Sequence, residues 1–272
     1  MATTAGAFIG NRLAENGAEI PIYRAAVPPS EKLAMPLKAP LSPGSRTVYA
    51  LGDVHGVLSE LMRVLELISL DGAKLGDQRP RVIGLGDYVD RGPESRGVIE
   101  VLSSDEMLEA FDPIFLRGNH DAAMSSVLSG HNVSDWLKHG GDKALLSYGV
   151  NPRGKKPNQW GDEFRAAVPD HHAEFLLDLE ICHVEGDFFF CHAGIDPADG
   201  LDGQNAVTLV HGARSFLSWP GVPGLTVVHG HWASPEVVVT PARIGVDTGC
   251  GWPDGHLSAV AIDPDGSVRV IS

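Results

Sequence analysis

The sequence predicts an α/β (α+β) fold in which two packed mixed β-sheets are flanked by helices. Three apolar segments in the first half of the chain are each followed by a polar turn and a helical pattern, as in βα units. The last third instead contains short apolar runs separated by turn signals, which is typical of mostly antiparallel strands. Units of the first kind followed by strands of the second predict sheets that pack face to face with helices outside.

Composition and charge narrow the range of functions. The 272 residues are 43% apolar and 21% charged, as in a soluble globular protein. A net charge of −14 repels polyanions, so no nucleic-acid partner is expected. Cys182, Cys191 and Cys250 show no paired spacing, which indicates a reducing compartment. No signal peptide or membrane-spanning stretch is recognisable, so we expect a cytoplasmic protein without a membrane partner. The sequence does not indicate the oligomeric state.

The chain begins with a segment that differs from the rest. Residues 1–45 are rich in alanine and proline and have no sustained periodicity, so we expect an N-terminal arm before a domain over 46–272. The first βα unit starts with a strand at Thr47–Leu51 and continues into the turn Gly52–Gly56. Apolar residues at helical spacing between 58 and 68 then predict an amphipathic helix that covers the sheet.

Two further βα units follow. The second has the strand Arg81–Leu85, the turn Gly86–Gly92 and a helix for which Pro93 is the expected first residue. The third has the strand Pro113–Leu116 and enters a helix after the turn Arg117–Asp121. Each turn stands at the carboxyl end of its strand, where open α/β sheets bind ligands.

The middle of the chain changes character. Between residues 130 and 178, short helical stretches separated by glycines predict a small helical cap inserted beside the site, as a source of substrate selectivity. Beyond it, an apolar run over 186–191 ends in His192, and another over 225–228 leads to His231. These runs repeat the arrangement of a strand followed by a polar side chain.

Six ligand-type side chains stand in turns after apolar strands. They are Asp53, His55, Asp87, Asn119, His192 and His231. A single histidine after a strand is more often a core or surface residue than a ligand, but six such residues in one chain favour a shared site. Their oxygen and nitrogen donors suit Mn²⁺, Fe²⁺ or Zn²⁺, and the absence of cysteine disfavours a structural zinc site.

Six ligands exceed what one ion uses if water also binds. We therefore expect two divalent metal ions that share Asp87, with Mn²⁺ as the expected metal and iron, zinc, nickel or cobalt as alternatives. Such a pair clamps the attacking and leaving oxygens of an in-line displacement at phosphorus and lowers the pKa of a bridging water. The residues thus indicate hydrolysis of a phosphate ester.

Three segments resemble the signature blocks of the phosphoprotein phosphatase family of calcineurin-like metallophosphoesterases. They are Gly52-Asp-Val-His-Gly56, Gly86-Asp-Tyr-Val-Asp-Arg-Gly92 and Arg117-Gly-Asn-His-Asp121, with His192 and His231 as the two later histidines. The resemblance extends from about Tyr49 to Ile262 and is closest to bacterial members, whose middle region resembles Trp136–Val150. It implies the four-layer α/β/β/α sandwich of that superfamily.

The resemblance also implies two ligand sets. The first metal would be held by Asp53, His55 and Asp87. The second would be held by Asp87, Asn119, His192 and His231.

The resemblance also implies which residues take part in catalysis and in phosphate binding. His120 would be the general acid that protonates the leaving alkoxide, and Asp90 would orient it, because an imidazole polarised by a carboxylate is a competent acid near neutral pH. Arg91 and Arg117 would bind phosphate oxygens through their planar guanidinium groups. Arg214 is the candidate for a further arginine that the family usually has between its later histidines. Its segment lacks the expected tryptophan pattern, so a surface salt bridge is the alternative.

The last block helps to separate branches of the superfamily. In Gly230-His231-Trp232-Ala233, alanine stands where phosphodiesterases and nucleases usually have a second histidine, and those enzymes mostly lack the Asp90-Arg91-Gly92 triplet. We therefore expect a metal-dependent phosphatase in which metal-activated water attacks in line. The expected substrate is a phosphorylated protein of the serine/threonine type or another small phosphoester.

Two alternatives remain open. Asp247-Thr-Gly-Cys250 with Trp252, and Asp121 in place of a glutamate, resemble the symmetrical diadenosine tetraphosphate hydrolases. However, Ala122-Ala123-Met124 follows where those enzymes normally have another histidine-containing stretch. A non-catalytic metal-binding interaction scaffold is more distant, because the expected acid and all expected ligands are present.

Overall fold

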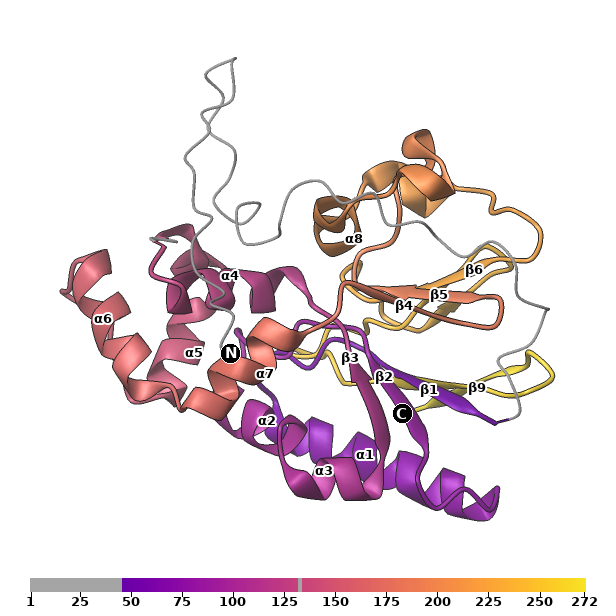
Figure 1. The fold of residues 1–272 in the computed structure, drawn as a ribbon, viewed down its shortest axis with the longest axis horizontal. Coiled ribbons are helices and arrows are strands. Elements are labelled where there is room, and N and C mark those ends of the chain that lie inside the picture. Colours follow the sequence, from indigo (N-terminus) through magenta and orange to yellow (C-terminus); the bar gives the residue numbers. More distant parts are fainter. Residues whose placement is uncertain (1–45, 132–133) are drawn as a thin grey trace, which may run out of the picture.

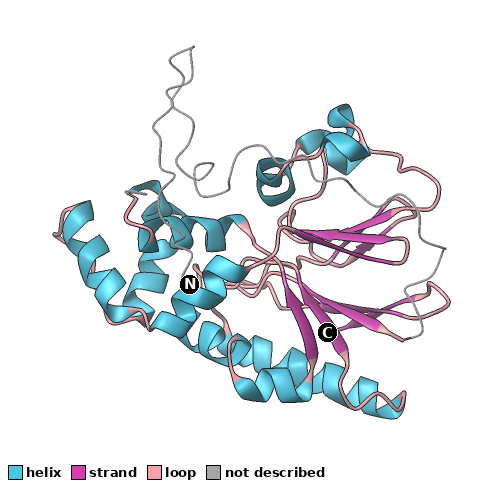
Figure 2. Ribbon diagram, viewed as in Figure 1, coloured by secondary structure: helices cyan, strands magenta, loops and turns pink. Residues whose placement is uncertain are grey.

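The computed structural model describes residues 46–131 and 134–272, so the arm expected at 1–45 lies outside the described residues. In this part of the chain, two five-stranded sheets pack face to face, and helices cover their outer sides (Figures 1 and 2). The predicted class of two packed mixed sheets flanked by helices is confirmed.

The first sheet has the strand order β10-β9-β1-β2-β3. Its strands are β1 (Val48–Leu51), β2 (Arg81–Gly84), β3 (Asp112–Phe115), β9 (Ala259–Ile262) and β10 (Val268–Ile271). β1, β2 and β3 are parallel, whereas β9 runs antiparallel to β1, and β10 runs antiparallel to β9. The loops after the three parallel strands therefore leave the sheet at the same edge.

The second sheet has the order β4-β5-β6-β8-β7. Its strands are β4 (Cys182–Glu185), β5 (Phe188–Cys191), β6 (Thr226–His229), β7 (Val238–Val239) and β8 (Arg243–Gly245). β5, β6 and β8 are parallel, and the edge strands β4 and β7 pair antiparallel with their neighbours. The sequence pattern did not predict β4, which has few apolar residues and is only half-buried.

The helices fall into three groups. Around the first sheet lie α1 (Leu58–Lys74), α2 (Ser95–Leu102) and α3 (Asp105–Ala110), whereas α4 (Asn119–Leu128) packs against the helices of the middle region. The middle region contains η2 (Ser134–His139), α5 (Gly141–Ser147), α6 (Pro157–Ala167) and α7 (Asp170–Asp178). Beside the second sheet lie η3 (Pro197–Asp199), η4 (Leu201–Gly203), α8 (Ala206–His211) and η5 (Arg214–Ser218).

Pro93 is not the first residue of a helix, because α2 begins at Ser95. The residues before α2 form hydrogen bonds with the loop after β1 rather than with a helical turn. The Gly92 N–H donates to the His55 carbonyl at 2.9 Å, and the Glu94 N–H donates to the Gly56 carbonyl at 2.9 Å. These bonds hold the turn of the second βα unit against that of the first.

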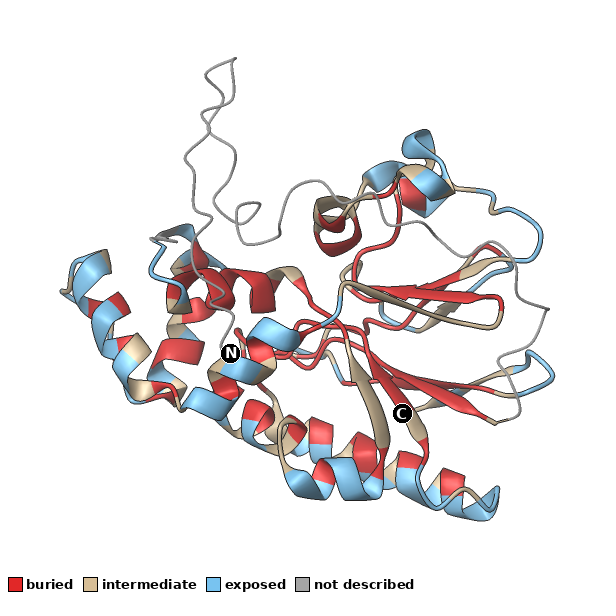
Figure 3. Cartoon of the chain, viewed as in Figure 1, coloured by how far each residue is buried: buried red, intermediate tan, exposed pale blue. Residues whose placement is uncertain are grey.

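The core has layers on both faces of the first sheet, whose central strands β9, β1 and β2 are largely buried (Figure 3). In β1, Val48 and Ala50 pack in the core between the sheets, while Tyr49 and Leu51 belong to the core shared with the helices. All four are fully buried, which explains why this strand is a continuous apolar run rather than an alternating one. The loops at its end are thus carried by a rigid support.

The middle region shares its core with the rest of the first layer. Trp136, Tyr148, Trp160 and Phe164 pack together and belong to the same cluster as the buried residues of α1 and α2. A role of residues 130–178 as a cap that selects the substrate stays a prediction.

Candidate metal centre

Loops from both sheets bring the six expected ligand residues together. Asp53 and His55 follow β1, Asp87 follows β2, and Asn119 starts α4 after β3. His192 follows β5 and His231 follows β6, at the adjoining edge of the second sheet. Four of the six side chains are almost fully buried, with exposed fractions of 2% or less for Asp53, His55, Asp87 and His192.

The second expected set is compact. His192 Nε2 lies 3.4 Å from Asp87 Oδ2, 3.2 Å from Asn119 Oδ1 and 3.2 Å from His231 Nδ1. His231 Nδ1 lies 2.9 Å from Asn119 Oδ1. Donor atoms that bind one ion at about 2.0–2.2 Å are themselves about 3 Å apart. These separations are close to those expected around a single divalent ion, and the Asp87, His192 and His231 donors lie within 4.8 Å of one another.

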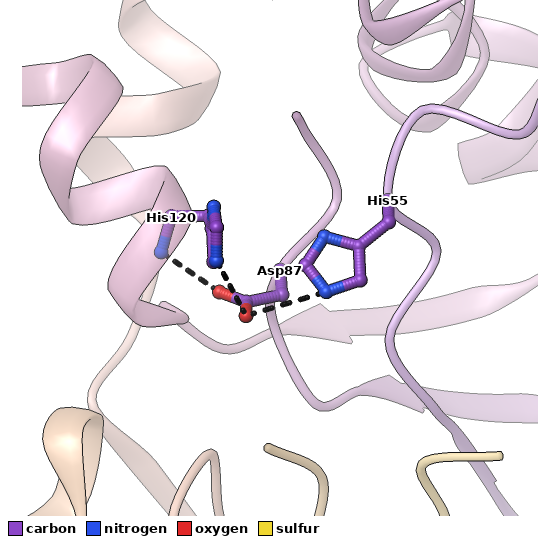
Figure 4. Close-up of side chains that lie close together, drawn as sticks. All are labelled: His55, Asp87 and His120. Carbon is purple, nitrogen blue, oxygen red and sulfur yellow. Dashed lines mark hydrogen bonds and ion pairs between the residues drawn. The ribbon is translucent and has the colours of Figure 1, made fainter. Parts of the chain in front are cut away.

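The first expected set is more open. His55 Nε2 lies 3.7 Å from Asp87 Oδ2 and 4.0 Å from Asp53 Oδ2. Figure 4 shows the rings of His55 and His120 on two sides of the Asp87 carboxylate. Oδ1 of this carboxylate also accepts the backbone N–H of His120 at 2.9 Å. The same Asp87 Oδ2 faces both sets, as sharing between two ions requires.

Backbone carbonyls fix the orientation of two of the histidine rings. The Nδ1 atoms of His55 and His192 lie 3.1 and 2.8 Å from the carbonyl oxygens of Val89 and Leu85. A carbonyl oxygen can only accept, so each neutral ring keeps its proton on Nδ1 and turns the lone pair of Nε2 toward the cluster. Metal-ligating histidines are commonly held in this way.

The buried carboxylates of the cluster favour the binding of cations there. Burial and then the charge of Asp247 raise the pKa of Asp53 well above its usual value. Burial lowers the pKa of His192, but the charge and hydrogen bond of Asp87 together with the charge of Asp53 outweigh this effect, and the pKa rises to about 10. The metal-free cluster thus holds a proton that a divalent ion would displace. Donor chemistry and charge both fit the expected ions.

A histidine–aspartate pair stands beside this cluster. His120, in the first turn of α4, places Nδ1 2.6 Å from Asp90 Oδ2, and Trp136 donates its indole N–H to the same oxygen at 2.6 Å. Burial lowers the pKa of His120, but the charge of Asp87 and the hydrogen bond to Asp90 together leave it above its ordinary value. Because Nδ1 is bonded to Asp90, Nε2 is the nitrogen that faces the cluster. A protonated His120 can therefore donate from Nε2.

Of the three arginines expected to bind phosphate, Arg91 alone has a contact with the cluster among the described residues. Its guanidinium lies 3.1 Å from His120 Nε2 and also contacts His55 Nε2. Arg117 is turned away, because its guanidinium donates to the carbonyls of Leu176 and Leu177 in α7 at 3.3 and 2.7 Å. Arg214 is exposed on η5. Phosphate binding by Arg117 or Arg214 would need these side chains to turn and stays a prediction.

The backbone is strained at the site. Within the described part of the chain, six residues other than glycine have φ in the left-handed region, and five of them are expected site residues: His55, Asp87, Asp90, Arg91 and His231. Such conformations are unfavourable for residues with a Cβ and concentrate at functional sites. Strain thus marks the same residues as the motifs do, by an independent criterion.

Two buried side chains that were not among the expected site residues support the loops. The Asp121 carboxylate accepts the N–H groups of Asp87, Tyr88 and Gly118 at 2.7, 3.0 and 2.9 Å, so it ties the loop after β2 to the start of α4. Its position in the first turn of α4, where a carboxylate can accept free backbone N–H groups, is a local signal that could have revealed it. Trp136 has no such local signal, since its partner Asp90 is distant in sequence.

Two packed sheets whose strand ends gather aspartate, histidine and asparagine donors beside a histidine–aspartate pair define a metal-dependent phosphoesterase. The chain belongs to the calcineurin-like phosphoesterase family, whose model matches residues 46–271. It is thus a hydrolase of a family that uses divalent metals, and its substrate is a phosphoester. The expected superfamily is confirmed, whereas the phosphoprotein phosphatase subfamily is not.

Curated relatives cover most of the chain. A symmetrical bis(5'-nucleosyl)-tetraphosphatase from Methylococcus capsulatus is 27% identical, over 79% of this chain and 91% of that protein. Another of the same name, from Nitrosomonas europaea, is 24% identical, over 79% of this chain and 94% of that protein.

Solved structures share the fold. One, provisionally named a diadenosine tetraphosphatase, has a TM-score of 0.58 and 22% identity over 86% of this chain and 96% of that one. A cold-active protein tyrosine phosphatase of a Shewanella species has a TM-score of 0.53 and 18% identity over 89% of this chain and 84% of that one.

In residues 46–131 and 134–272, no helix is both long and apolar enough to cross a membrane.

Proposed function

We propose that this chain hydrolyses bis(5'-nucleosyl) tetraphosphates symmetrically, so that each molecule yields two nucleoside diphosphates. The observation that carries the proposal is the position of the loop from Asp247 to Trp252, which resembles the symmetrical hydrolases. Cys250 Sγ donates to the Val54 carbonyl at 3.2 Å, and the Trp252 ring lies over the Arg91 guanidinium, so the loop lines the candidate site. The names of the curated relatives support the same substrate.

The chain's own side chains suit the central cleavage. Two divalent ions held by the six donors would supply an activated water and polarise the phosphoryl oxygens. Arg91 donates to those oxygens and His120 gives its Nε2 proton to the bridging oxygen as the central P–O bond breaks. The products are two diphosphates, and Asp90 holds the His120 ring during the transfer.

Phosphoprotein hydrolysis, the expectation from the signature blocks, is the second candidate. The observation that favours it is Trp136, which lies in the region resembling bacterial protein phosphatases and donates to Asp90. The same dyad would protonate the alkoxide of serine or threonine, which is a far poorer leaving group than a diphosphate and depends more on the acid.

Parallel turnover measurements separate the two candidates. Mn²⁺-loaded protein is given diadenosine tetraphosphate, a phosphoserine peptide and p-nitrophenyl phosphate, with metal-stripped protein as the control. The proposal expects the highest kcat/KM for the dinucleotide, with ADP as the single nucleotide product. AMP and ATP in equal amounts would mean asymmetric cleavage, and a preference for the peptide would replace the proposal with the second candidate.

A further inference from the structure

Trp252 leaves a large aromatic surface open at the edge of the candidate site. Its side chain is 56% exposed, although aromatic side chains of this size are usually largely buried. It does not belong to any of the apolar core clusters of the described residues. Single exposed apolar side chains are common, so the place of this ring, rather than its exposure, carries the argument.

The ring lies directly beside the expected phosphate-binding group. The centre of the Arg91 guanidinium is 4.9 Å from the centroid of the Trp252 ring, and the same guanidinium reaches His120 Nε2 at 3.1 Å. One side of Arg91 thus faces the reacting groups, while its plane adjoins the tryptophan. A molecule whose phosphate is bound by Arg91 has its next groups beside this ring.

The loop that carries Trp252 is held firmly. The Trp252 N–H donates to the Gly249 carbonyl at 3.0 Å, and the Gly255 N–H donates back to the Trp252 carbonyl at 3.1 Å. A Cβ on Gly251, where φ is +84°, would come within 2.9 Å of His55 Cβ and 3.2 Å of Arg91 Cβ. Glycine there lets the loop pack closely on the two site residues, so the ring is presented in a fixed place.

We propose that Trp252 is the platform on which one base of a nucleoside polyphosphate stacks while its phosphates occupy the site at Arg91. The inference rests on the proposed function and names how that substrate is recognised. Every nucleobase has a flat π surface, so a stacking platform accepts different bases without reading their edges. Arg91 supplies the local positive charge that an anionic ligand requires on a chain with a net charge of −14.

Binding of ADP and of inorganic pyrophosphate by the full chain tests the platform without turnover. Calorimetry on Trp252→Ala, Trp252→Phe and the unaltered chain gives the ratio of the two affinities, and pyrophosphate carries no base. Stacking lost to alanine is expected to lower the preference for ADP by about 5- to 150-fold, and phenylalanine should restore most of it. Leu75→Ala, at an equally exposed side chain at the end of α1, is the control and should leave the ratio as it is.

Kinetics with diadenosine tetraphosphate then separate the inference from the proposed function. If Trp252→Ala raises KM more than it lowers kcat, the base contributes binding shared by substrate and transition state. An unchanged ADP preference in Trp252→Ala overturns the platform even if the dinucleotide is the substrate. If the unaltered chain cleaves monoesters but not the dinucleotide, the proposed function fails, and the ADP-to-pyrophosphate ratio still decides whether Trp252 binds a base.

Discussion

Replacing Trp136 with phenylalanine removes one hydrogen bond from the carboxylate that orients His120. The indole nitrogen is 2.6 Å from Asp90 Oδ2, and both partners are fully buried, so bulk water does not reach this carboxylate. Asp90 Oδ1 already lacks a hydrogen-bond partner in the described structure. Trp136→Phe would therefore leave a buried carboxylate with fewer donors, which raises the pKa of Asp90 further and loosens its hold on His120.

The size of the effect follows from the charge of the acceptor. A hydrogen bond to a charged group contributes roughly 1.5–3 kcal/mol. At about 1.4 kcal/mol for each factor of ten, full transfer of that loss to the transition state would lower kcat about 10- to 150-fold. The loss is shared with the free energy of unfolding, so we expect kcat to fall about tenfold with metal content retained.

Trp160→Phe is the matched control. Its ring centroid lies 6.3 Å from that of Trp136 in the same aromatic cluster, and the side chain is 2% exposed, so the same atoms are removed from the same core. Steady-state kcat with p-nitrophenyl phosphate and diadenosine tetraphosphate is measured for both variants, with thermal unfolding and metal analysis alongside. An equal fall of kcat in the two variants would mean that the Trp136 hydrogen bond has no catalytic role.

Three further predictions concern His120 and its surroundings. His120→Asn should lower turnover about 10²- to 10⁴-fold while metal analysis shows an unchanged content, and the loss should be larger for a phosphoserine peptide than for p-nitrophenyl phosphate. Burial lowers the pKa of His120, but the charge of Asp87 and the hydrogen bond to Asp90 raise it, and ions bound at Asp87 would offset the part due to Asp87. The kcat profile should therefore fall as pH rises through that pKa, and a profile without this limb would contradict the assignment. Asp121→Asn places an amide N–H opposite one of the three backbone N–H groups that the carboxylate accepts. This change should lower the free energy of unfolding by about 1–3 kcal/mol, measured by urea titration. An unchanged midpoint would show that the carboxylate is dispensable.

Most of the strands, and the loops that carry the expected ligands, could be predicted because both depend on local patterns. An apolar run such as 82–85 followed by glycine and a polar turn indicates a buried strand with functional groups at its end, and parallel pairing brings such ends together. α3 was not predicted although Ser104 caps it by accepting the Met107 N–H at 3.1 Å. Only six residues long, it lacks the sustained periodicity that reveals longer helices.

Side-chain directions depend on tertiary partners that local patterns do not contain. Arg117 is the first residue of a signature block, yet its guanidinium donates to carbonyls of α7, some sixty residues later. Trp136 meets Asp90 in the same long-range manner. Neither direction could have been deduced from the residues around it.

The substrate expected from the sequence was inferred from the three signature blocks. These blocks are the least informative part of the chain about the identity of the substrate. The turns 52–56 and 86–92 are the expected metal and phosphate centre, which would serve any phosphoester in the same way. Discrimination between esters needs groups beyond the reacting phosphorus, and Trp252, the proposed example, is outside the three blocks. Motif strength therefore predicts chemistry better than it predicts specificity.

Left-handed backbone at five expected site residues lowers the stability of the fold at the residues on which activity is expected to depend. They are His55, Asp87, Asp90, Arg91 and His231. Each such residue costs on the order of 1 kcal/mol, which is a sizeable share of a typical net stability of about 5–15 kcal/mol. Glycine at any one of them would relieve the strain and remove a working side chain at the same time. Selection for thermal tolerance alone would thus favour inactive variants at these residues, and any heat-resistant descendant that keeps its activity must have gained its stability elsewhere in the fold.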